Sequence, residues 1–130
     1  MSTGIAMPYH QRPKNLDLAS IRLPVPALVS ILHRASGALI FLLLPVLLWA
    51  LQQSTEAGGY AGLVNMMDST WIKPPLLVLI WAFIHHFLAG IRHLTLDMRF
   101  GLEIRQARRS SKLVLVAGLV LTLLAGIWLW

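Results

Sequence analysis

Two histidines and a glycine at helical spacing could support chemistry inside a membrane. His86, Gly90 and His93 follow one another by four and three residues, so on a helix they share one face, which Asp97 continues. They end a long apolar run, where an ionisable side chain is costly and marks a functional site by default. An imidazole can ligate haem iron, and the glycine leaves room for a flat ligand. We therefore predict a haem pocket at His86, with two packing histidines as the simpler alternative.

A second polar group opens the first long apolar run of the chain. His33 and Arg34 lie about as far into that run as His86 lies from the end of its own, so all three should reach a similar membrane depth. Haem propionates need cations or hydrogen-bond donors. Arg34, Arg92 and His93 lie nearer the surface and could supply them. Matching depth on two separate helices favours a shared site.

Ser30 and Arg34 form an i, i+4 pair near the start of the same run. A hydroxyl and a guanidinium can hydrogen-bond a quinone carbonyl and stabilise the negative charge that develops when the quinone is reduced. Taken from spacing alone, a helix-start serine and a membrane-anchoring arginine are the better interpretation.

Three apolar spans would position these residues, at about 27–51, 75–94 and 113–130. Each is close to the roughly 20 residues that an α-helix needs to cross a hydrocarbon core of about 30 Å. Pro45 should kink the first span, and the polar loop at 52–70 has room for a short interfacial helix. We predict an all-α integral membrane protein with three transmembrane helices.

The third span has no ionisable side chain. Its Gly118, Thr122 and Gly126 recur every four residues, a small-residue pattern that lets helices approach closely in lipid. We expect this face to pack in assembly with a partner subunit.

Basic residues set the expected orientation. Of the eleven Lys and Arg residues, four lie before or at the start of the first span and six lie between Arg92, at the end of the second span, and Lys112. Only Lys73 lies in the other loop. The positive-inside rule places the basic side in the cytoplasm, or in the matrix of a mitochondrion. We therefore expect a cytoplasmic amino-terminal segment at 1–26, a transmembrane anchor domain at 27–130, and an external carboxyl terminus.

Composition excludes several classes of protein. The 130 residues are 57% hydrophobic and 12% charged, outside the usual range of a soluble domain. The absence of cysteine excludes thiolate chemistry and any iron–sulfur cluster held by this chain alone. The net charge of +6 is explained by basic residues beside apolar spans, so no nucleic-acid partner is expected.

Three sequence elements match a known family. They are R-P-K-N-L-D-L at Arg12–Leu18, S-I-L-H-R-A-S-G at Ser30–Gly37 and H-x-x-x-G-I-R-H-L-x-x-D at His86–Asp97. In this order and spacing the chain closely resembles the cytochrome b membrane-anchor subunit of succinate dehydrogenase over nearly its whole length.

The resemblance implies roles for individual residues. His86 corresponds to the ligand of haem b, whose second axial histidine comes from a partner anchor subunit. Ser30 and Arg34 correspond to part of the ubiquinone site, which the partner anchor and the iron–sulfur subunit complete. His33, Arg34 and His93 correspond to residues near the haem propionates.

The resemblance also implies a function and a location. The chain would anchor a flavoprotein and an iron–sulfur subunit in the lipid bilayer and would not oxidise succinate alone. His85, about 100° around the helix from His86, has no counterpart role. A bacterial inner membrane is favoured over the mitochondrial one. The alternatives are the anchor of a related quinol:fumarate reductase and a purely structural anchor without haem.

Overall fold

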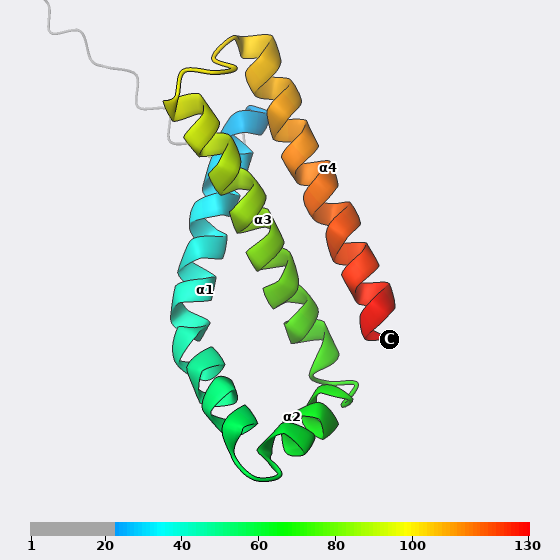
Figure 1. Ribbon diagram of the computed structural model, residues 1–130. Helices are drawn as coiled ribbons and strands as arrows, with labels where there is room; N and C mark the ends of the chain where they lie inside the picture. Colours follow the sequence, from blue (N-terminus) through cyan, green and yellow to red (C-terminus); the bar gives the residue numbers. More distant parts are fainter. Residues whose placement is uncertain (1–22) are drawn as a thin grey trace, which may run out of the picture.

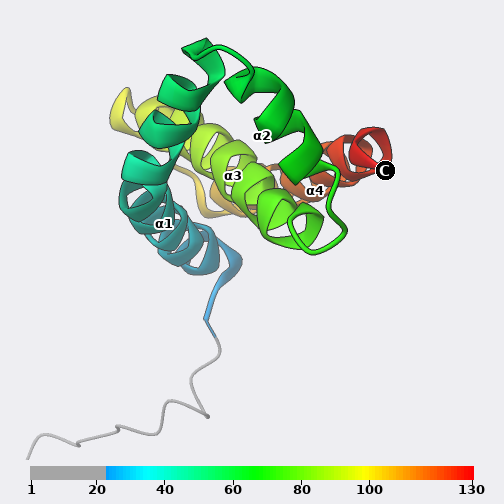
Figure 2. The same ribbon diagram turned by 90° about the horizontal axis from the view of Figure 1, so that it is seen from below.

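The computed structural model describes residues 23–130, so the element at Arg12–Leu18 lies outside the described residues. Within this range the chain forms the helices α1 (Val25–Thr55), α2 (Gly59–Met67), α3 (Lys73–Asp97) and α4 (Ile104–Leu129). The helices α1, α3 and α4 run side by side, and α2 lies across one end of the bundle (Figure 1; Figure 2). These three are long and apolar enough to cross a membrane, which confirms the predicted all-α fold with three long apolar helices.

Prolines and left-handed residues mark the helix boundaries. Both α1 and α3 carry proline in the first turn, where a missing backbone N–H removes no helical hydrogen bond. Gly58 (φ 78°) turns the chain from α1 into α2. Arg99 (φ 64°) and Gly101 (φ 77°) reverse it between α3 and α4. Glycine adopts this conformation freely, whereas it is uncommon for an arginine.

The structure gives the outcome of two local expectations, a kink at Pro45 and a basic connector before residue 113. The helix α1 continues through Pro45 and is bowed, as Figure 1 shows. The basic connector predicted before residue 113 is largely helical, because α4 begins at Ile104. Hydropathy locates the part of a helix that lies in lipid, whereas Arg, Gln and Ala extend a helix well beyond it.

The helix α3 packs against both α1 and α4. Its side towards α4 buries Ala82, His85, Ala89 and Arg92, and α4 buries Ser111, Val114, Gly118 and Thr122. The small residues of the third span thus pack on α3 of the same chain, not on a separate subunit: the Gly118 backbone meets His85, and that of Gly126 meets Leu77.

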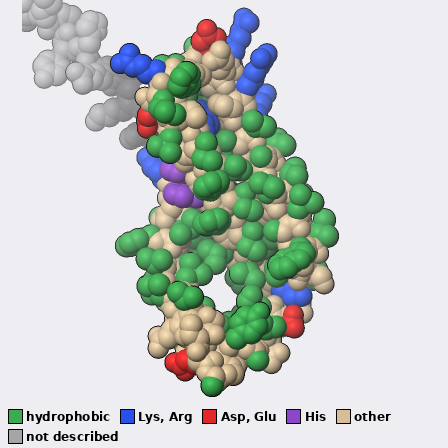
Figure 3. Space-filling model, in the orientation of Figure 1, with side chains coloured by type: hydrophobic (Ala, Val, Ile, Leu, Met, Phe, Trp, Pro, Cys, Tyr) green, Lys and Arg blue, Asp and Glu red, His purple; other side chains and the backbone are tan. Residues whose placement is uncertain are grey.

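Most large apolar side chains lie on the outside of the bundle. Figure 3 shows them covering its length, with Lys and Arg gathered at the end where α3 gives way to α4 and a separate cation near the opposite end. Such an apolar surface needs lipid or another protein to cover it. The chain is a multi-pass membrane protein.

Candidate functional site

The crossing of α1 and α3 brings together the histidines that the sequence singled out. The rings of His33 and His86 are stacked, with centroids 4.2 Å apart and planes 9° from parallel. The ring of His93 lies 5.0 Å from that of His33 and is tilted by 50°. Within residues 23–130, no three His, Cys, Asp or Glu side chains are arranged to hold a metal ion between them.

Each helix presents a histidine to a glycine of the other. A Cβ atom added to Gly37 of α1 would lie 2.8 Å from Cε1 of His86, and one added to Gly90 of α3 would lie 3.5 Å from Nε2 of His33. The room at Gly90, which the sequence led us to assign to a ligand, therefore lies beside the His33 ring. Gly37 was missed as a site residue. The signal was present, because His33 and Gly37 repeat the H-x-x-x-G spacing of His86 and Gly90.

Hydrogen bonding defines which nitrogen of the His86 imidazole carries the hydrogen. Its Nδ1 lies 3.1 Å from the carbonyl oxygen of His33 and 3.4 Å from Oγ of Ser36. A carbonyl oxygen only accepts, so Nδ1 carries the hydrogen and Nε2 of the neutral ring keeps its lone pair. Among the described residues, the hydrogen bonds of His86 involve Nδ1 alone. Histidines that bind metals are commonly held in this way by their second nitrogen.

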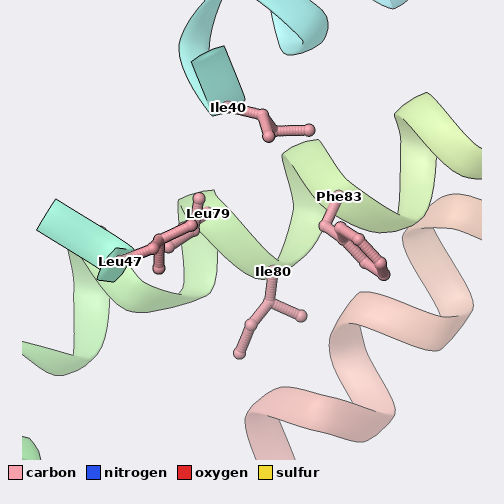
Figure 4. Close-up of a pocket in the computed structure, with 5 residues that line it drawn as sticks. All are labelled: Ile40, Leu47, Leu79, Ile80 and Phe83. Atoms are coloured by element: carbon pink, nitrogen blue, oxygen red, sulfur yellow. The ribbon is translucent and has the colours of Figure 1, made fainter. Parts of the chain in front are cut away.

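An apolar pocket begins one helical turn from the histidine pair, on the side towards α2. It has a volume of about 330 Å³ and is lined by Ile40, Leu47, Leu79, Ile80 and Phe83 (Figure 4). Ile40 follows Gly37 by one turn of α1, and Phe83 precedes His86 by one turn of α3. The imidazole of His86 thus lies between an apolar pocket and a polar end that holds His33 and His93.

The two residues predicted to bind quinone lie together near the start of α1. Nε of Arg34 donates to the backbone carbonyl of Ser30 over 3.4 Å, and the Arg34 side chain is exposed. Ser30 is partly buried and precedes His33 by three residues. This contact leaves part of the guanidinium fork for a molecule arriving at this end of α1.

Arg92 does not join the histidine cluster. It is 6% exposed and points to α4, where Nε donates to Oγ of Ser110 (3.1 Å) and a terminal nitrogen donates to the carbonyl of Ala107 (3.4 Å). Its expected role beside the propionates is therefore wrong for this arrangement. Successive positions of α3 point in different directions, and Arg92 follows the face of His85 and Ala89.

His85 occupies a different face of α3 from the histidine cluster, towards α4. It is 1% exposed, stacks on Trp81 at 5.4 Å and faces the backbone of Gly118. Its Nε2 has no hydrogen-bond partner among the described residues. Packing closes off this ring on every side, so it has no room for a large ligand.

Comparison with known proteins identifies a family to which this chain is similar. The sequence model of the family "Succinate dehydrogenase/Fumarate reductase transmembrane subunit" matches residues 8–125. The chain is 35% identical to the succinate dehydrogenase cytochrome b556 subunit of Coxiella burnetii, over 92% of this chain and 98% of that protein. It is 35% identical to the protein of the same name from Paracoccus denitrificans, over 87% and 88% of the two chains.

A mitochondrial relative is similar over a shorter part of its length. The succinate dehydrogenase cytochrome b560 subunit of Dictyostelium discoideum is 30% identical over 85% of this chain and 59% of that protein. The family match covers α1, α3, most of α4 and both H-x-x-x-G elements. The chain therefore belongs to the succinate dehydrogenase/fumarate reductase transmembrane subunit family, as its sequence elements indicated.

Proposed function

We propose that this chain is the membrane anchor of a succinate dehydrogenase in which His86 is an axial ligand of haem b. The observation that carries the proposal is the hydrogen bonding of His86. Its Nδ1 is hydrogen-bonded to a carbonyl of α1, and no described residue makes a hydrogen bond with Nε2. The names of the relatives as b-type cytochromes support it. Bound haem would supply a one-electron carrier between the iron–sulfur subunit and quinone.

The residues around His86 suit such a group. The apolar pocket lined by Ile80 and Phe83 can hold an apolar ring edge. His33, Arg34 and His93 lie at the opposite, polar end and can donate hydrogen bonds to propionates. His33 stacks on the face of the His86 ring, away from the in-plane direction of the Nε2 lone pair, so it does not block the ligand position.

The remaining parts of the proposed complex come from other chains. A second small anchor subunit supplies the other axial histidine, and an iron–sulfur subunit and a flavoprotein carry succinate oxidation. This chain has no cysteine with which to bind a cluster. The exposed apolar side chains along α1, such as Phe41 and Leu42, offer a surface for the second anchor and for lipid.

Ser30 and Arg34 form this chain's part of the ubiquinone site in our proposal. Both lie in the first turns of α1, and Arg34 is exposed. Donors directed at the quinone oxygen stabilise the charge that develops there during reduction. The cluster of cations between α3 and α4 supports an orientation with this end in the cytoplasm of a bacterium and the chain in the inner membrane.

The experiment that tests the proposal is purification of the complex from solubilised membranes, followed by identification of its subunits and an absorption spectrum. We expect a low-spin haem b together with flavoprotein and iron–sulfur subunits. A complex without haem would favour a purely structural anchor. Steady-state turnover that is faster for fumarate reduction by quinol than for succinate oxidation would favour the anchor of a quinol:fumarate reductase, which the family description also covers.

A further inference from the structure

We propose that α1 positions the His86 imidazole and strengthens its donation of electrons, through the carbonyl of His33 and the missing side chain of Gly37. The inference rests on the proposed role of His86 as a haem ligand. It assigns to Gly37 and Ser36 a positioning role, which they exert through His86 without contacting iron.

The close approach of the two helices depends on Gly37. A Cβ at this position would lie 2.8 Å from Cε1 of His86, closer than real Cβ atoms come to their neighbours, and 3.2 Å from Nδ1, which is a tight contact. The imidazole would have to move, and both its Nδ1 contacts with α1 would lengthen. Only glycine lets the ring reach the His33 carbonyl.

The hydrogen bond at Nδ1 bears directly on the opposite nitrogen. Donation of the Nδ1 hydrogen to a carbonyl raises the basicity of Nε2 and fixes the orientation of the ring. A more basic axial ligand stabilises oxidised iron, so it lowers the haem potential. Loss of this bond should therefore raise the potential and weaken haem binding.

Ser36 shares the same acceptor and so modulates the bond. Its Oγ donates to the His33 carbonyl over 2.9 Å and lies 3.4 Å from Nδ1 of His86, and the residue is 2% exposed. Two donors thus compete for one carbonyl oxygen. Removing the hydroxyl leaves that oxygen to the imidazole, which should strengthen the Nδ1 bond and lower the potential.

The near-repeat on α3 provides a matched control. Gly90 faces the His33 ring just as Gly37 faces the His86 ring. A Cβ at Gly90, however, would be 3.5 Å from the His33 ring, an ordinary van der Waals contact. Gly62 of α2 has nothing within 4 Å of an added Cβ. Three Gly→Ala substitutions therefore add the same methyl group at a tight, a fitting and an open position.

The test measures haem content, the midpoint potential of the haem and its low-temperature spectrum in the purified complex. For Gly37→Ala we expect about a ten-fold rise in the ratio of reduced to oxidised haem at a fixed potential, which is about 59 mV for one electron. Haem affinity should fall about ten-fold, as is common for residues that support a metal ligand. Gly90→Ala should stay within about two-fold of the native ratio, and Gly62→Ala should match it.

Ser36→Ala adds no volume and keeps the test decisive if Gly37→Ala does not assemble. It should shift the potential in the opposite direction, by a smaller amount. A native potential and haem content in Gly37→Ala, or an unchanged or raised potential in Ser36→Ala, would overturn the inference. Failure of the proposed function is a separate result: haem would be absent from the native complex or would survive His86→Leu with an unchanged spectrum.

Discussion

Adjacent histidines of α3 face two different helix contacts. His86 faces α1, where its ring stacks on His33 and one nitrogen is hydrogen-bonded to the backbone. His85 faces α4, where it is fully enclosed and Nε2 has no partner among the described residues. The α1–α3 contact leads to an apolar pocket of about 330 Å³ one turn from His86. The α3–α4 contact is closed by small residues beside His85, and its own pocket of about 360 Å³ lies further along, lined by residues such as Leu88, Arg92 and Ser110.

The surroundings of the two histidines distinguish a candidate ligand from a packing residue, although both side chains are of the same type. An imidazole can bind a group only if one nitrogen is oriented by the protein and the other is accessible. His86 meets both conditions, whereas His85 is fully enclosed and offers no accessible nitrogen. Nε2 of His85 has no hydrogen-bond partner within residues 23–130, and a buried polar atom without one carries a penalty of about 1–3 kcal/mol.

The largest expected effect follows from replacing each of these two histidines with leucine in turn. His86→Leu should abolish the low-spin haem spectrum, because it removes the only nitrogen of the pair that can reach a ligand. His85→Leu should keep the spectrum and leave stability unchanged or slightly raised, because it removes the unpartnered buried nitrogen. Absorption spectra of both purified complexes distinguish the two. The opposite pattern would mean that the ligand faces α4.

The next effect concerns electron delivery to quinone from the α1 side. Ser30→Ala should lower succinate–quinone reductase turnover about ten-fold or more, since removing one donor to a developing charge costs about that much or more. Succinate oxidation with a soluble artificial acceptor should be unaffected, because that reaction does not use the membrane site. Arg34→Leu should behave similarly and also disturb the haem spectrum. Full quinone activity in both variants would reduce the pair to a helix start and a membrane anchor.

The sequence predicted the two contacts unequally. The three long helices and the meeting of His33, His86 and His93 follow from hydropathy and helical spacing, which the structure confirms. The direction of Arg92 and the mutual fit of Gly37 with His86 do not follow, because both depend on how α3 is rotated between its neighbours. Periodicity identifies which residues share a face, but it does not say which helix that face meets.

A smaller effect tests the polar link in the α3–α4 contact. Ser110→Ala removes the acceptor of Arg92 Nε and should lower the free energy of unfolding by about 1–3 kcal/mol, because a buried charged donor loses its partner. Ser111→Ala is the matched control. Its hydroxyl also bonds the carbonyl of Ala107 but makes no link to α3, so its cost should be lower. Thermal unfolding of the detergent-solubilised complex measures both, and an equal or greater loss in Ser111→Ala would contradict the role of Arg92.

The smallest effect sharpens the contrast between the glycines of the two contacts. Gly118 of α4 is buried beside His85, but a Cβ there would lie 3.9 Å from Nδ1 of that ring, an ordinary contact. Gly118→Ala should therefore leave haem content unchanged and alter stability by no more than about 1 kcal/mol in the favourable direction, the gain in helix propensity. Gly118→Leu should destabilise the complex, because a longer side chain cannot enter the closed contact. If Gly118→Ala lowered haem content as Gly37→Ala is expected to do, the α3–α4 contact would not be independent of the haem site. The separation of the two faces of α3 would then fail.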